Sequence, residues 1–286
     1  MVLLSSMLLS ASNTRSVKAI GTINIGADGS ISPSEAPVSS LDRVTYLFTG
    51  NITDSIVVER SSIVIDGAGY TVEGDGTGNG FSLIDVTNVT IKNTRINSCF
   101  DGIRLFNSSG DMITGNSINA SSYEGIGLYY SSDSNIAGNS ITNNQIGVGF
   151  YDSSNNSIVD NNIVNNTYQA YTESSVNAWD DGSKGNYWSD YDGTDSNQDG
   201  IGDTSYIIDT SNQDRYPLMK PIAKPSLTTD VNRDGVVNIL DIFLIARSYK
   251  TIRGAPGWNP YADIDGNGVI DIRDIVAVAL DFGKTG

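Results

Sequence analysis

Residues 80–170 repeat with a period of 22 to 23 residues, and this periodicity constrains the fold more than any other feature. Gly80, Gly102, Gly125 and Gly147 recur at steps of 22, 23 and 22, and a further step of 23 reaches Ala170. The same steps connect two isoleucine columns, which are Ile91, Ile113, Ile136 and Ile158, and Ile96, Ile118, Ile141 and Ile163. Such a fixed period is typical of a solenoid whose units stack on one another.

The segments between these columns alternate as strands do. In "GIRLFNSSG", "GIGLYYSSD" and "GVGFYDSSN", every second residue is apolar, so one side of each strand faces a core. Asn, Ser and Gly fill the rest and are poor helix formers, which argues against a helix-containing leucine-rich repeat. The pattern predicts a mainly β chain that forms a right-handed parallel β-helix. We expect isoleucine columns inside, glycines with positive φ at the corners, and stacked Asn116, Asn139 and Asn161 side chains at a turn.

The chain divides into three predicted regions. Residues 1–20 contain an apolar run similar to a signal-peptide h-region, with a buried N-terminal segment as the alternative. Residues 21–222 form the β-helix domain, with regular coils from about 45 to 188 and a capping region at 176–222. Trp179, Tyr187, Trp188 and Tyr191 are expected to close the apolar end. Residues 227–286 form a separate calcium-binding domain.

The repeats and the segment after them resemble a known family. Residues 185–219 read "GNYWSDYDGTDSNQDGIGDTSYIIDTSNQDRYPLM", which is similar to the NosD-like, or carbohydrate-binding-and-sugar-hydrolase-type, β-helix proteins of archaeal secretomes. The resemblance covers roughly residues 20–222 and implies the β-helix fold. It implies no copper site here, because the chain has no histidine to supply nitrogen ligands.

Two loops near the C-terminus carry alternating oxygen donors at the spacing of a calcium loop. In "DVNRDGVVNILD" positions 1, 3, 5, 7, 9 and 12 are Asp230, Asn232, Asp234, Val236 (through its carbonyl), Asn238 and Asp241. In "DIDGNGVIDIRD" they are Asp263, Asp265, Asn267, Val269, Asp271 and Asp274. Gly235 and Gly268 at position 6 allow the sharp turn around Ca²⁺. The alternative is a pair of solvated acidic turns.

Each loop leads into an apolar-periodic segment without an entering helix, and this arrangement resembles a type I dockerin over about residues 227–285. The resemblance implies two calcium ions and a cohesin-like or other cell-surface partner. Dockerins of cellulose-degrading complexes place small hydroxyl residues at loop positions 10 and 11, whereas this chain has Ile239 and Leu240, then Ile272 and Arg273. Because the module is small, calcium is expected to supply much of its folding free energy.

A third acidic run, "DSNQDGIGD", is a candidate calcium site that braces the end of the solenoid. It places Asp195, Asn197, Asp199, Ile201 and Asp203 at positions 1, 3, 5, 7 and 9. It lacks a position-12 carboxylate and a following helix, and an ordinary acidic turn is the alternative.

The outward face of the repeats offers two further candidates. Phe106, Tyr129 and Tyr151 share one column, which forms either a sugar-binding aromatic surface or a structural ladder. Asp101 and Glu124 share another column and could act as an acid/base pair. Ile146 and Gln169 continue that column, which indicates an unselective exposed edge.

The overall charge limits the partners. With 33 acidic and 17 basic residues and a net charge of −16, nucleic-acid binding is disfavoured, and the apolar run at residues 1–20 is too short to span a membrane. The sequence predicts an extracellular or cell-surface calcium protein that contacts carbohydrate or surface components without catalysing a reaction. The alternatives are a polysaccharide lyase or glycoside hydrolase, and a self-assembling surface protein whose solenoid ends pair.

Overall fold

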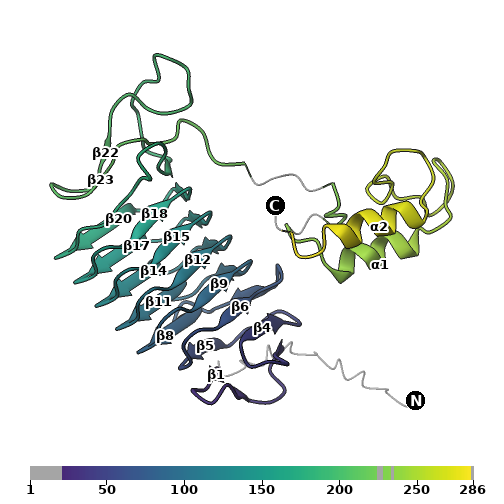
Figure 1. Ribbon diagram of the computed structural model, residues 1–286, viewed down its shortest axis with the longest axis horizontal. Coiled ribbons are helices and arrows are strands. Elements are labelled where there is room, and N and C mark those ends of the chain that lie inside the picture. Colours follow the sequence, from purple (N-terminus) through teal and green to yellow (C-terminus); the bar gives the residue numbers. More distant parts are fainter. Residues whose placement is uncertain (1–20, 224–227, 233–234, 285–286) are drawn as a thin grey trace, which may run out of the picture.

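The computed structural model describes residues 21–223, 228–232 and 235–284, which form a parallel β-solenoid followed by a small helical module (Figure 1). This confirms the predicted fold class. The expected signal-like segment at 1–20 lies outside the described residues.

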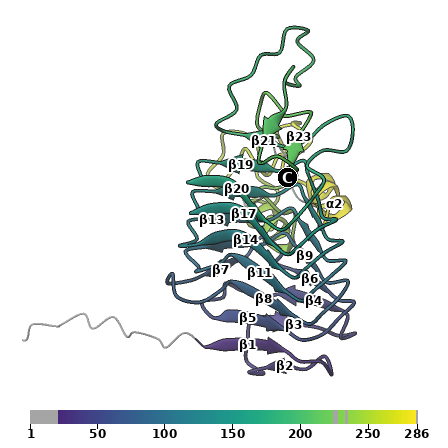
Figure 2. The same ribbon diagram turned by 90° about the vertical axis from the view of Figure 1, so that its left-hand side faces the viewer.

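Three mainly parallel sheets form the sides of the solenoid, with one antiparallel pair at the first end of sheets A and B, and each regular coil contributes one strand to each sheet (Figure 2). Sheet A has the spatial order β2 (Ile31–Ser32), β1 (Thr22–Ile25), β5 (Ser55–Val58), β8 (Phe81–Ile84), β11 (Ile103–Phe106), β14 (Glu124–Tyr129), β17 (Ile146–Tyr151) and β20 (Tyr168–Glu173). Sheet B runs β3 (Val38–Ser39), β4 (Thr45–Phe48), β6 (Val64–Asp66), β9 (Thr90–Lys92), β12 (Met112–Thr114), β15 (Asn135–Ala137) and β18 (Ser157–Val159). Sheet C runs β7 (Thr71–Glu73), β10 (Arg95–Asn97), β13 (Ser117–Asn119), β16 (Ser140–Thr142), β19 (Asn162–Val164) and β21 (Tyr187–Trp188).

The predicted isoleucine columns form the core. Ile91 pairs with Ile113, which pairs with Ile136, and Ile96 pairs with Ile118 in the same way on sheet C. These side chains are fully buried. Apolar residues therefore stack on like residues of the neighbouring coils, as the repeat predicts. Regular coils begin earlier than residue 45, because β1 already pairs in parallel with β5.

The glycine column has a different role from the one predicted. Gly80, Gly102, Gly125 and Gly147 do not have positive φ values; residues such as Gly115 and Gly138 do, at φ +67° and +69°. A Cβ added at Gly102 would lie 2.5 Å from a methyl carbon of Ile118 and 2.6 Å from the carbonyl oxygen of Gly125. The column needs glycine because adjacent coils approach closely in the interior, not because the chain turns there.

The last repeat step is also shorter than expected. Val148 pairs with Ala170 and Ile146 pairs with Tyr168, so this step is 22 residues. Ala170 therefore does not continue the glycine column, and Tyr168 rather than Gln169 continues the column of Asp101 and Glu124.

The predicted asparagine ladder is confirmed. Asn116 Nδ2 donates to Asn139 Oδ1 at 3.1 Å, and Asn139 Nδ2 donates to Asn161 Oδ1 at 3.0 Å. Each amide also donates to a backbone carbonyl, as Asn139 does to Ile113 at 2.8 Å. Asn186 ends the ladder by accepting from Asn161 at 2.9 Å. The ladder satisfies backbone groups at a turn that has no strand pairing.

A cap closes the C-terminal end of the solenoid. Trp179 and Trp188 are buried, and Tyr206 stacks on Trp188 with ring centroids 4.2 Å apart. Trp188 Nε1 donates to Asp214 Oδ2 at 2.8 Å. Two short strands, β22 (Tyr206–Ile207) and β23 (Gln213–Asp214), pair within this region. The tryptophans therefore act as the predicted apolar plug.

The helical module contains α1 (Ile239–Arg247) and α2 (Ile272–Leu280). Asn238 and Asp271 cap these helices, and each cap forms a capping box with an aspartate three residues later. The buried core of the module is small: Val231, Val237, Ile245, Ala262, Ile270 and Val278. In the part of the chain that the structure describes, no helix has the length and apolar character needed to cross a membrane.

Candidate functional site

The second acidic loop, residues 263–274, gathers three carboxylates. Oxygens of Asp263, Asp265 and Asp274 lie within 4.8 Å of one another, the one such group among the described residues. Asp263 Oδ2 accepts from the Gly268 backbone at 3.0 Å, whereas its buried Oδ1 has no hydrogen-bond partner within the described ranges. A buried, unpartnered carboxylate oxygen is costly unless a cation compensates it. The loop therefore fits Ca²⁺, which prefers carboxylate oxygens.

Asp274 links this loop to α2. Its Oδ1 accepts from Ile264 N at 2.7 Å and from Asp265 N at 3.3 Å, and its Oδ2 accepts from Asp271 N at 2.8 Å. Closure of the loop and initiation of the helix thus depend on one side chain. Of the other predicted ligands, Asn267 donates to Asp265 Oδ2 at 2.8 Å, and Asp271 caps α2. Val269 is 38% exposed on the loop.

The first loop, residues 230–241, has the same internal hydrogen bonds. Gly235 N donates to Asp230 Oδ2 at 2.7 Å, as Gly268 N does to Asp263. Asp241 accepts from Asn232 N at 3.0 Å and from Asn238 N at 2.7 Å. Val236 is buried, and the predicted ligand Asp234 lies outside the described residues. The two loops therefore share their internal hydrogen bonds, and a calcium ion in the first loop remains a prediction.

The third run reproduces only the first half of this pattern. Gly200 N donates to Asp195 Oδ2 at 3.0 Å and Ile201 N to Asp199 Oδ1 at 2.8 Å. Asn197 donates to Asp199 at 2.9 Å. Asp203, however, accepts from the backbone and hydroxyl of Ser196 and from Thr194. Because Ser196 and Thr194 use the Asp203 carboxylate, a third calcium site stays a prediction.

The carboxylates of Asp101 and Glu124 are fully buried, so the expectation of an unselective exposed edge is wrong. Glu124 Oε2 accepts from the Tyr129 hydroxyl at 3.0 Å and Oε1 from the Tyr151 hydroxyl at 2.7 Å. Burial raises the pKa of Glu124 to about 7. Asp101 accepts from Glu124 N at 3.2 Å and forms an ion pair with Arg104 at 3.4 Å, and burial raises its pKa as well. Buried and hydrogen-bonded in this way, the two carboxylates position neighbouring side chains.

The three aromatic residues of the predicted column do not present a continuous stacking surface. The rings of Tyr129 and Tyr151 stack with centroids 4.6 Å apart and planes 5° apart. The guanidinium of Arg104 lies 4.3 Å from the Tyr129 ring centre. Both faces of Tyr129 are therefore occupied. Phe106 remains 40% exposed and contacts Tyr130 edge to face.

Two glycines on sheet A are the sequence signal that could have revealed this buried network. Gly127 and Gly149 occupy the outward position that Arg104 has on the preceding coil. A Cβ at either position would clash with the carboxylate of Glu124, which lies flat across both coils. Glycine at an outward strand position, where a side chain would normally stand, indicates close approach by another group.

We expect Gly149→Ala to displace Glu124 and to lower the stability of the solenoid by about 1 to 3 kcal/mol, because overpacking forces neighbouring groups to shift. Thermal unfolding followed by circular dichroism would measure the loss. Gly50→Ala is a matched control, since its added Cβ would meet only Pro37 at 3.5 Å. Equal melting temperatures for the two variants would contradict the close approach of Glu124.

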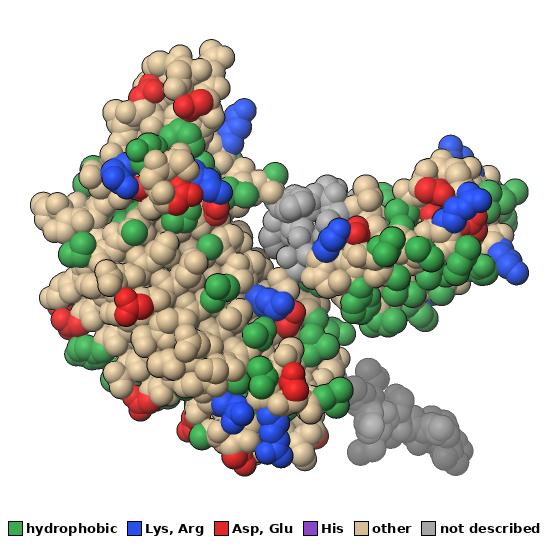
Figure 3. Space-filling model, in the orientation of Figure 1, with side chains coloured by type: hydrophobic (Ala, Val, Ile, Leu, Met, Phe, Trp, Pro, Cys, Tyr) green, Lys and Arg blue, Asp and Glu red, His purple; other side chains and the backbone are tan. Residues whose placement is uncertain are grey.

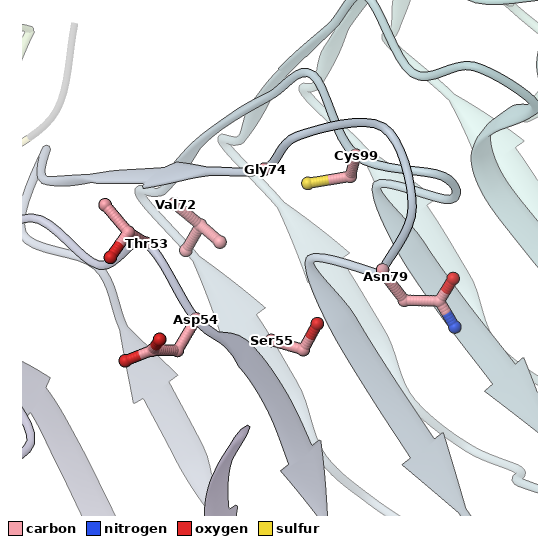
Figure 4. Close-up of a pocket in the computed structure, with 8 residues that line it drawn as sticks. Thr53, Asp54, Ser55, Val72, Gly74, Asn79 and Cys99 are labelled. Carbon is pink, nitrogen blue, oxygen red and sulfur yellow. The ribbon is translucent and has the colours of Figure 1, made fainter. Parts of the chain in front are cut away.

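Cys99 lines a separate hollow with Asp54, Val72 and Asn79 (Figure 4). Its volume is about 10 Å³, enough for roughly one water molecule. Burial raises the pKa of the Cys99 thiol to about 12, so the thiol is protonated at neutral pH.

Comparison with known proteins supports a two-part chain. The family model for the type I dockerin domain matches residues 228–280, the segment that holds both acidic loops and both helices. Type I dockerin domains bind calcium, and the Asp263, Asp265 and Asp274 group could hold such an ion. No curated protein is a match for this chain.

The family model described as periplasmic copper-binding protein (NosD) matches residues 13–193. The residues of this chain do not fit copper, because there is no histidine and the single thiol is buried. The fold and the extent of the match, more than half of the 286 residues, nevertheless place the solenoid clearly: the chain belongs to the NosD family of periplasmic copper-binding proteins.

Proposed function

We propose that this is a secreted or cell-surface protein whose helical module docks, in a calcium-dependent manner, onto a cohesin-type partner and thereby displays the solenoid. The observation that carries the proposal is an exposed apolar surface on the module. Phe243 on α1 and Leu280 on α2 are 57% and 78% exposed. Figure 3 shows hydrophobic side chains gathered on one face of the module.

The two helices contribute to this surface in equivalent ways. Ile239, Leu240 and Phe243 are exposed on α1, and Ile272 and Val276 are exposed at the matching positions of α2. Contiguous apolar surface of this kind marks a protein-binding site in a soluble domain. Small hydroxyl residues are absent from positions 239, 240, 272 and 273, so the partner is expected to present a complementary apolar face.

Affinity capture from the surface fraction of the native host tests this role. The full chain is expected to retain a protein with a cohesin-type domain in calcium, and to lose it in EGTA. The double variant Phe243→Asp, Leu280→Asp is expected to weaken binding at least 100-fold, because it places two charges in a desolvated interface. Val176→Asp is the control, since Val176 lies outside the module and is as exposed as Phe243. Retention in EGTA, or by the double variant, would overturn the proposal.

The solenoid itself is proposed to contact carbohydrate through the outer face of sheet A without catalysing a reaction. Exposed Phe106 and the polar groups beside it support this role. The burial of Asp101 and Glu124 argues against their acting as the acid/base pair of the lyase or hydrolase alternative.

Self-association is the other alternative. The strands β2 and β3 fold back onto the first coils, and β21 pairs with β19 in the cap. Strand addition by a second copy would use a terminal strand such as β20, beyond which sheet A has no further described strand.

A further inference from the structure

A hollow on the outer face of sheet A lies over β8 and β11, beside the buried Asp101 and Glu124 network. Its volume is about 240 Å³. The lining residues are Asn79, Ser82, Leu83, Ile84, Arg104 and Phe106. This volume is slightly below the roughly 300 to 1,000 Å³ of a site for a drug-sized molecule. The hollow therefore has room for a smaller ligand, of about one sugar ring.

The lining divides into a polar part and an apolar part. Asn79 Nδ2 donates to Ser82 Oγ at 3.0 Å, and Arg104 stands beside them with its side chain 34% exposed. Ile84 and Phe106 supply the apolar part and are about 40% exposed. A pyranose ring has the matching character, because its hydroxyl groups form a polar edge and its C–H groups form an apolar face that packs on aromatic rings.

Arg104 is held rigidly from two sides. Its guanidinium pairs with Asp101 at 3.4 Å and lies 4.3 Å from the centre of the Tyr129 ring. Tyr129 is in turn fixed by its hydrogen bond to Glu124. Burying two carboxylates beneath an exposed surface is costly. The fold does not require a carboxylate there, because the next coil of sheet A has Ile146 at the position of Glu124. Buried groups that orient an exposed one are the support that a binding site needs.

The local charge favours a neutral ligand. Asp101 balances the charge of Arg104, and the chain as a whole carries a net charge of −16. An anionic sugar would meet no excess of positive charge in this hollow and would be repelled at longer range. Arg104 therefore serves as a hydrogen-bond donor to hydroxyl groups rather than as a counter-ion.

We propose that this hollow binds one neutral hexopyranose unit of a glycan, with Arg104, Asn79 and Ser82 contacting its hydroxyl groups and Phe106 stacking on its ring. The proposal deepens, and rests on, the proposed contact between the solenoid and carbohydrate. It does not depend on the partner of the helical module.

Isothermal titration of the full chain with linear hexasaccharides of glucose, mannose, xylose and N-acetylglucosamine, and with an oligogalacturonate, tests the site. At least one neutral hexose oligomer is expected to bind with millimolar or tighter affinity, in calcium and in EGTA alike. Arg104→Ala and Phe106→Ala are each expected to weaken binding at least tenfold. Arg95→Ala on sheet C and Tyr168→Ala at the other end of sheet A are matched controls that should change binding less than twofold. Melting temperatures would confirm that every variant is folded.

Each other result would overturn the inference. Absence of binding by the neutral hexose oligomers, preference for xylose oligomers or oligogalacturonate, or unchanged affinity in Arg104→Ala and Phe106→Ala would each contradict it. Calcium-dependent capture of a cohesin-type partner would stand in all these cases, so failure of the sugar site is distinguishable from failure of the docking role.

Discussion

Removal of calcium is expected to unfold residues 228–284 and to leave the solenoid folded. The buried core of the module comprises six small or medium apolar residues, which is too few to fold a domain of this size without further stabilisation. Its two helices have nine residues each, and helices of that length are not stable alone in water. Without the ion, Asp263, Asp265 and Asp274 would also repel one another, because their oxygens lie within 4.8 Å.

The size of this effect follows from ligand linkage. An ion present at about 1,000 times its dissociation constant stabilises the folded state by about 4 kcal/mol. EGTA is therefore expected to abolish the helical circular dichroism signal of the module, and calorimetry is expected to show one calcium-dependent and one calcium-independent transition. A single transition unaffected by EGTA would contradict the role of the loops in folding.

Asp263→Asn gives a sharper test of the second loop. The amide retains an acceptor for Gly268 N but places a neutral group at the unpartnered Oδ1 position. We expect calcium affinity to fall at least 100-fold, with loss of helix signal at low calcium. Asp281→Asn is the matched control, because Asp281 contacts Thr229 and Lys284 outside both loops. Equal calcium affinity in the two variants would exclude Asp263 as a ligand.

The fold could be predicted from sequence because each coil repeats the same inward residues. Ile91 and Ile113 stand at one register position, so their period predicts both the strand and its buried face. The grouping of the loop carboxylates could be predicted for a similar reason, since the spacing of Asp263 and Asp274 brings their oxygens within 4.8 Å of one another. Both inferences need only the spacing along the chain.

The buried network on sheet A could not be predicted in this way. The position of Glu124 in its column predicts one more outward side chain, but this side chain bends across Gly127 and Gly149 to meet two tyrosines. Similarly, Asp203 has the spacing of a ligand, yet neighbouring hydroxyl and backbone groups use its carboxylate. Spacing predicts which residues share a face, whereas competition between hydrogen-bond partners decides what each side chain does.

The stability of the solenoid is expected to fall as the pH rises from 4 to 8, and Asp111 should account for much of the change. Asp111 Oδ1 accepts from Val89 N at 2.8 Å, but its buried Oδ2 has no hydrogen-bond partner in the described part of the chain. Burial raises the pKa of Asp111 to about 7. The folded protein therefore keeps a proton that the unfolded chain loses near pH 4. The retained proton on Asp111 adds to the free energy of unfolding. This stabilisation is fully present below pH 4 and is lost as the pH rises to 7, and the total loss is at most about 4 kcal/mol.

Asp111→Asn is expected to remove this loss and to raise the stability at pH 8 by up to about 4 kcal/mol, or roughly 10 °C in melting temperature for a domain of this size. The amide fits because Asn156, two coils along the same column, donates its Nδ2 to a backbone carbonyl at 3.2 Å. At pH 4 the variant should differ little from the natural chain, because Asp111 is then protonated in the folded state and still partly protonated in the unfolded state. The reverse change, Asn156→Asp, should destabilise the solenoid more at pH 8 than at pH 4, while the exposed Asp152→Asn should have no effect. A pH-independent gain in Asp111→Asn would show that packing rather than ionisation is responsible, because only the charged form of Asp111 is penalised by burial.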